Sequence, residues 1–134
     1  MQKIIIFLIL INTFLLGADM QIKLLFNNQE LLVNLDKNET SKEFYQSLPL
    51  ELEFSDFIGK EKIAHLPNEL KNNNSNGYEP EIGDLFYYAP WGNIGIFYEK
   101  QPFNRDIIFL GKVQGNLELL RAQKGNFKVK ITRE

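Results

Sequence analysis

The chain has 134 residues, 44% of them hydrophobic, which is enough for one compact domain and too short for two. A formal net charge of −2 leaves no basic excess to neutralise a phosphate backbone, so we expect no nucleic-acid partner. The chain has no cysteine and one histidine, which excludes disulfides, thiolate chemistry and Cys-ligated metals. No glycine-rich phosphate loop precedes a helix, so we expect no nucleotide-type cofactor. No cluster of metal ligands is visible in the sequence either, so we expect no metal.

The first 18 residues have the order of a secretory signal peptide. Lys3 is followed by the apolar run Ile4–Leu16 and then by a polar boundary at Asp19. The run of about 13 residues is shorter than the roughly 20 that span a bilayer as a helix. We therefore expect residues 1–18 to be a signal peptide cleaved near Ala18, and the mature protein to be periplasmic or secreted, without a membrane span. An uncleaved anchor is the alternative, because Leu16 stands where a small residue is usual.

Residues 20–26 and 29–35 are two β-rich runs separated by Asn27-Asn28, a pair that tolerates left-handed backbone and predicts a tight hairpin. Next, Thr40 followed by Glu43 three positions later predicts a capping box at the start of a short helix. We expect this helix to end near Gln46 and to be buried through Phe44 and Leu48.

Residues 50–55 alternate strictly between apolar and polar side chains, as in a strand with one buried face. Leu52 and Phe54 should point into the core, and Glu51 and Glu53 toward solvent, opposite lysines on a neighbouring strand. A catalytic carboxylate pair is the alternative for the two glutamates, but their spacing along one strand favours a solvated face. His65, at the end of the next segment, has no partner for metal binding and is expected to be a structural or surface residue.

Polar residues dominate 71–77, which we expect to form a mobile loop. The aromatic side chains and the only Trp are concentrated in residues 83–98. Two β-rich runs, 85–88 and 94–98, flank Ala-Pro-Trp-Gly-Asn, which predicts a strand–turn–strand unit. About half of its aromatic side chains should point inward, leaving the others, with Trp91 at the turn, as an exposed patch suited to binding.

The apolar run at residues 107–113 indicates a buried strand, and the alternation at 127–131 indicates a closing strand. Between them, we expect residues 116–122 to form a short helical turn. Short strands at regular spacing with one or two helices predict a mainly β fold, a closed or nearly closed barrel formed by residues 19–134. We expect this domain to be a monomer.

Four segments, Leu48–Leu50, Lys62–Pro67, Gly83–Asn93 and Leu110–Val113, follow one another in an order that resembles the small bacterial cyclophilin-like family. The resemblance covers about residues 20–123. It implies a cyclophilin-like β-barrel, and a shared fold does not fix function.

True prolyl isomerases of this fold carry an Arg in a Phe-His-Arg motif beside a proline pocket, and this chain has no such motif. Arg105 is the one basic residue near the aromatic stretch that could take its place.

We therefore expect no catalytic residue and a module that binds a peptide or small molecule through Tyr88, Trp91, Asn93 and Arg105. A peptidyl-prolyl isomerase assisting exported proteins is the alternative, and another enzyme or a structural accessory of the envelope is a third class.

Overall fold

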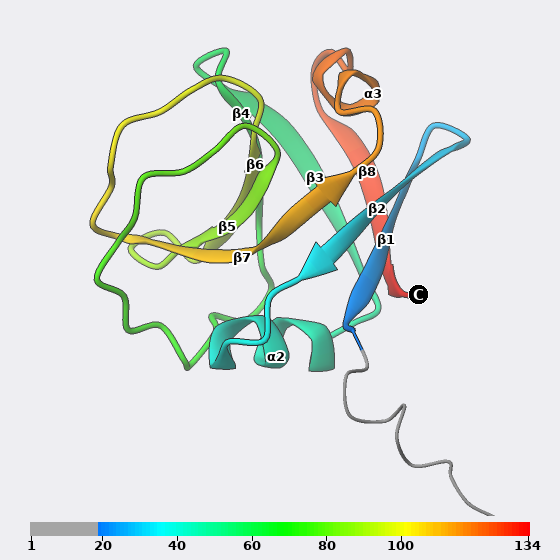
Figure 1. The fold of residues 1–134 in the computed structure, drawn as a ribbon. Coiled ribbons are helices and arrows are strands. Elements are labelled where there is room, and N and C mark those ends of the chain that lie inside the picture. Colours follow the sequence, from blue (N-terminus) through cyan, green and yellow to red (C-terminus); the bar gives the residue numbers. More distant parts are fainter. Residues whose placement is uncertain (1–18) are drawn as a thin grey trace, which may run out of the picture.

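The computed structural model describes residues 19–134, which form a closed barrel of eight antiparallel strands with two short helices (Figure 1). The strands are β1 (Gln21–Phe26), β2 (Gln29–Leu35), β3 (Leu50–Phe57), β4 (Glu61–His65), β5 (Asp84–Tyr88), β6 (Asn93–Phe97), β7 (Ile107–Gln114) and β8 (Phe127–Arg133); the helices are α2 (Glu39–Gln46) and α3 (Glu118–Arg121). The order around the barrel is β1-β2-β7-β5-β6-β4-β3-β8, and β8 pairs with β1. The predicted barrel is confirmed, whereas the predicted signal peptide at residues 1–18 lies outside the described residues. Neither α2 nor α3 has the length and apolar character needed to cross a bilayer.

The two clearest local signals in the sequence form the predicted elements. Asn27 and Asn28 both adopt positive φ, 47° and 60°, and connect β1 to β2 in a tight hairpin. In β3, Leu52 and Phe54 are buried in the core. Glu51 and Glu53 are exposed and lie opposite Lys130 and Lys128 of β8. The glutamates therefore occupy the solvated face of a strand, as predicted.

The prediction for the start of α2 was wrong. Asn38 is the N-cap, and its side-chain oxygen accepts a hydrogen bond from the amide of Ser41 at 2.8 Å. Thr40 lies inside the helix, buried, and its hydroxyl donates to the carbonyl of Asn72. Glu43 accepts hydrogen bonds from the amides of Lys71 and Asn72. Burial alone would raise the pKa of Glu43, but these bonds hold it below its usual value. The glutamate therefore anchors a loop and does not cap the helix.

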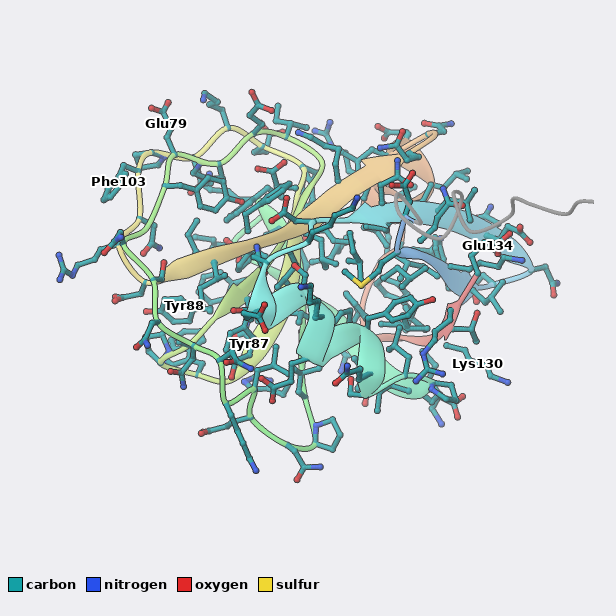
Figure 2. The ribbon with its side chains drawn as sticks, turned by 60° about the horizontal axis from the view of Figure 1, so that its bottom comes forward. Glu79, Tyr87, Tyr88, Phe103, Lys130 and Glu134 are labelled. Atoms are coloured by element: carbon teal, nitrogen blue, oxygen red, sulfur yellow. The ribbon has the colours of Figure 1, made fainter. Side chains whose placement is uncertain are left out.

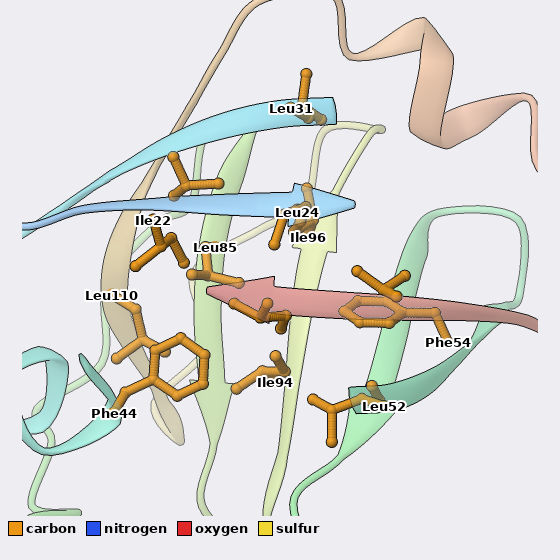
Figure 3. Close-up of a cluster of buried hydrophobic side chains, with 14 of the residues drawn as sticks. Ile22, Leu24, Leu31, Phe44, Leu52, Phe54, Leu85, Ile94, Ile96 and Leu110 are labelled. Atoms are coloured by element: carbon orange, nitrogen blue, oxygen red, sulfur yellow. The ribbon is translucent and has the colours of Figure 1, made fainter. Parts of the chain in front are cut away.

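Side chains from the strands and from both helices fill the interior of the barrel. Figure 3 shows Phe44, carried by α2, beside Leu110 of β7, and Phe54 among the side chains of the opposite wall. Leu48, which follows α2, is also buried, so both predicted contacts of this helix are confirmed. Phe54 packs on Phe127 of β8 with ring centroids 5.9 Å apart.

Strand β4 reverses the usual polarity of a barrel strand. Lys62 points inward and is 2% exposed; its ammonium forms an ion pair with Asp56 at 3.2 Å and donates to the carbonyl of Gln123 at 2.7 Å. Its neighbours Glu61 and Ile63 consequently point outward, because successive side chains of a strand alternate between faces. His65, on the same outer face, is exposed, as expected for a surface residue.

The alternation of β3 gives a direct stability test. Leu52→Ala should lower the free energy of unfolding by about 2–5 kcal/mol, because it removes buried methyl groups and leaves a cavity. Glu53→Ala, its matched control one position away, should change it by less than about 0.5 kcal/mol. Urea unfolding monitored by circular dichroism would measure both, and equal midpoints for the two variants would contradict the assignment of faces.

Candidate functional site

Strands β5 and β6 are buried on both faces. Leu85, Tyr87 and Ile94 belong to the core inside the barrel. Phe86 and Phe97 point the other way, and they form a second buried cluster on the outside with Ile107 of β7. The aromatic side chains of this hairpin were expected to divide between the core and an exposed patch that includes Trp91. Trp91 is exposed as expected, but Phe86 and Phe97 are not, because a second layer of chain covers these outward-facing rings.

Gly95 makes the outer cluster possible. It pairs with Ile63 of β4 on one side and with Phe86 of β5 on the other. A Cβ at this position would lie 2.5 Å from the ring of Phe86 and 3.1 Å from the side chain of Ile63, so only glycine leaves the ring its place. Phe86 instead stacks on Phe97 with centroids 4.2 Å apart and an interplanar angle of 15°. The two rings form the floor of the site.

Two long loops, residues 66–83 and 98–106, run along the side of the barrel formed by β5, β6 and β7 (Figure 1). The backbones of Tyr78 and Asn104 exchange two hydrogen bonds of 3.2 and 3.1 Å, which joins one loop to the other. The hydroxyl of Ser75 donates to the carbonyl of Ile107, which ties the first loop to β7. The segment predicted to be a mobile loop, 71–77, therefore lacks helix and strand but is anchored at several points.

Where this cover stops, a cavity of about 240 Å³ opens on the outer face of the barrel; we call it the outer-face cavity. It is lined by Phe57, Glu61, Ile63, Phe86, Tyr88, Trp91, Asn93, Phe97, Gln101, Pro102, Phe103, Asn104 and Ile107. Figure 2 shows Tyr88 and Phe103 on the same side of the molecule, opposite Lys130 and Glu134.

Trp91 sits at the rim of this cavity and is 52% exposed. Its ring lies nearly perpendicular to those of Phe57 and Tyr88, at centroid distances of 5.7 and 5.3 Å. Edge-to-face contacts of this kind are favourable for aromatic pairs and hold the indole in place. Phe103, on the opposite loop, is 58% exposed. The rim is thus formed by large, partly uncovered aromatic side chains.

Asn93 supplies an unsatisfied acceptor. The residue is 2% exposed and lines the cavity, and its side-chain nitrogen Nδ2 donates to the backbone carbonyl of Ile94 at 3.2 Å. Its side-chain oxygen receives no hydrogen bond from any residue in the described range. A buried acceptor without a donor is costly and calls for an explanation, of which a ligand donor is one.

Glu61 is the carboxylate of the cavity. It is half-buried, and burial, with the charge of Asp56 as a smaller cause, raises its pKa to about 7 from an ordinary value of 4.5. Within residues 19–134 no lysine or arginine lines the cavity. The same part of the chain holds no group of His, Asp and Glu side chains arranged for a metal ion. The cavity therefore offers one carboxylate, several neutral polar side chains and aromatic surface.

Three of the four residues predicted for binding, Tyr88, Trp91 and Asn93, line the outer-face cavity together. Arg105 is exposed in the turn after Asn104 and is not part of the lining. Sequence analysis missed Glu61, whose neighbours show no alternation that marks an outward face.

The closed eight-stranded antiparallel barrel with two short helices is consistent with a cyclophilin-like fold. The chain belongs to the Cyclophilin-like family, whose model matches residues 24–132. It is also similar to the solution structure of the hypothetical protein AF2241 from Archaeoglobus fulgidus, with a TM-score of 0.66 and 19% identity over 87% of this chain and 95% of that one. At this identity the likeness shows the fold alone. The comparison with curated proteins found no match.

The raised pKa of Glu61 predicts a pH dependence of stability. Between about pH 4.5 and 7 the unfolded chain has lost this proton while the folded chain retains it, so Glu61 lowers the free energy of unfolding progressively as pH rises. Glu61→Gln cannot ionise, so its stability relative to wild type should rise across this window and then level off. Denaturant unfolding at a series of pH values would measure the difference.

Glu53→Gln, on the solvated face of β3, is the control and should show no such rise. Parallel curves for wild type and Glu61→Gln would contradict the assignment.

Proposed function

We propose that this protein is an exported, non-catalytic binding domain whose outer-face cavity takes a peptide or a small molecule. One observation carries the proposal: a cavity of about 240 Å³ on the outer face of the barrel is walled by aromatic side chains and holds a carboxylate, Glu61, that has no ion-pair partner within residues 19–134. Apolar concave sites with a few fixed polar groups are the usual form of a ligand site. The site stands mainly on strands, which hold its groups rigidly.

The alternative function, prolyl isomerisation, has less support. Rotation about the prolyl bond crosses a barrier of about 18–20 kcal/mol, and its catalysis needs a donor placed at the amide as conjugation is lost. The lining provided by residues 19–134 contains no arginine or lysine, and Arg105 lies outside it. Ile63, Phe97 and the rim aromatics could still hold a proline ring, which keeps binding of such peptides within the proposal.

The only tryptophan of the chain reports on this site. Titrating a library of blocked tetrapeptides, some containing proline, into the chain from Asp19 onward should change Trp91 fluorescence for those that bind. By calorimetry, Trp91→Ala should weaken the best of them by about tenfold or more, as expected for a central aromatic side chain. Tyr45→Ala, an aromatic change on α2 outside the cavity, is the control and should bind like wild type.

Equal affinities for wild type and Trp91→Ala would contradict the proposed site. The same peptides test the alternative. A large acceleration of prolyl isomerisation, abolished by Arg105→Ala, would make the protein an isomerase and overturn the non-catalytic proposal.

Export is proposed from the sequence of residues 1–18, with its basic start, short apolar run and polar boundary at Asp19. N-terminal sequencing of the protein purified from the cell envelope or medium should find Asp19, or a residue one or two positions away, as the first residue. Recovery with Met1 intact from the cytoplasm would contradict it.

A further inference from the structure

Among the described residues that line the outer-face cavity, Glu61 is the one charged side chain. The other polar side chains there, those of Tyr88, Trp91, Asn93, Gln101 and Asn104, are neutral and include donors as well as acceptors. Glu61 forms no side-chain hydrogen bond and no ion pair with any other residue between 19 and 134, although nine ion pairs join acidic and basic side chains there. The side-chain oxygen of Asn93 is buried and has no donor in the same range. Glu61 is thus a carboxylate of the cavity wall without a partner in this range, whereas Asn93 lies opposite His65, four residues further along β4.

We propose that the outer-face cavity binds a primary alkylammonium group, such as the side chain of lysine, with the carboxylate of Glu61 as its acceptor. Glu61 pairs with Phe57 of β3 and with Phe97 of β6, two aromatic residues of the cavity lining. The inference rests on the proposed function and adds the chemical class of the ligand. An ammonium carries three N–H donors and no acceptor, which complements a carboxylate that has no partner. Its charge would compensate the carboxylate of Glu61, and its N–H groups would donate to the carboxylate oxygens.

The aromatic rim suits the same ligand. Phe57 and Tyr88 both stand nearly perpendicular to Trp91, at 83° and 86°, so three rings form a corner at the rim. A cation is attracted to the face of an aromatic ring, most strongly to Trp, and the attraction grows where water is excluded. The apolar side chains of Ile63 and Phe97 offer a surface for the methylene stem that carries the ammonium.

Among the described charged groups near the cavity, the carboxylate of Glu61 is the one available to pair with a bound cation. After burial, the charge of Asp56 on β3 is the other cause that raises the pKa of Glu61. Burial would raise the pKa of Asp56, but the hydroxyl of Tyr98, the amide of Gly59 and the ammonium of Lys62 hold it below its usual range. The lining residues of loop 98–106 are uncharged.

Lys62 is committed to Asp56 and to the carbonyl of Gln123 inside the barrel. Lys60 belongs to the β3–β4 turn and does not line the cavity. Neither lysine therefore occupies the site.

The test compares two blocked tripeptides, Gly-Lys-Gly and Gly-norleucine-Gly, which share the aliphatic stem and differ in the ammonium. Binding to the chain from Asp19 onward is measured by calorimetry at about pH 8, where Glu61 is ionised. The lysine peptide should bind about tenfold more tightly than the norleucine peptide. Glu61→Gln should remove this preference, and Glu53→Gln, on the solvated face of β3, should keep it. Pentylammonium against 1-pentanol, run alongside, shows whether the free amine suffices or a peptide is needed.

A second measurement uses wild type alone and does not depend on the folding of a variant. Lowering the pH to about 5.5 protonates Glu61 but leaves lysine charged, so the preference for the lysine peptide should shrink. Equal binding of the two peptides, no binding of either, or a preference that survives both Glu61→Gln and acid would overturn the inference. The first and third of these outcomes leave the proposed function standing if binding still depends on Trp91. In the second, the peptide library decides the proposed function separately.

Discussion

The packing on the outer wall of this barrel depends on a glycine, Gly95, at the centre of β6. Gly95 leaves room for the ring of Phe86 to lie across β6, and Phe86 then stacks on Phe97 at 4.2 Å. This stack makes the outer face of β5 and β6 apolar, so both faces of these strands must be covered. The inner face packs into the barrel core, and loops 66–83 and 98–106 supply the second cover. The outer-face cavity is the place where that cover is incomplete.

The core and the site lie on opposite faces of β5 and β6. The inward side chains of the barrel form one core (Figure 3), to which loop 66–83 contributes Leu70. Glu61 and Asn93 are carried by β4 and β6, so the pairing of these strands fixes their positions. The loops contribute the exposed ring of Phe103, and the Tyr78–Asn104 bridge joins one loop to the other. Rigid strands with loops above them are a common basis for a binding site.

Much of the barrel could be predicted because its signals are local. The Asn27-Asn28 turn and the alternation in β3 depend on residues next to one another, and both formed as expected. The start of α2 was misplaced because Asn38 and Thr40 are both acceptable caps. Contacts with a loop about thirty residues away engage Thr40 and Glu43, and sequence spacing does not reveal them.

The site was only partly predictable for a similar reason. The hairpin 83–98 pointed to Tyr88, Trp91 and Asn93, since aromatic density and turn residues are visible in the sequence. Glu61 escaped notice because β4 buries Lys62 inside and turns Ile63 outward, the reverse of what hydrophobicity alone predicts. The ion pair of Lys62 with Asp56 on the neighbouring strand β3, together with its hydrogen bond to the carbonyl of Gln123, accounts for that orientation. Arg105 is close to the hairpin in sequence but not part of the cavity.

The central claim is that the outer-face cavity is where this protein binds its ligand. Intermolecular nuclear Overhauser effects between the tightest-binding peptide and the isotope-labelled chain would test it most directly. We expect contacts from one peptide side chain to the indole protons of Trp91, the ring of Phe57 and the methyl groups of Ile63. Contacts confined to another surface, such as the polar hollow lined by Asn38 and Asn72, would contradict the account.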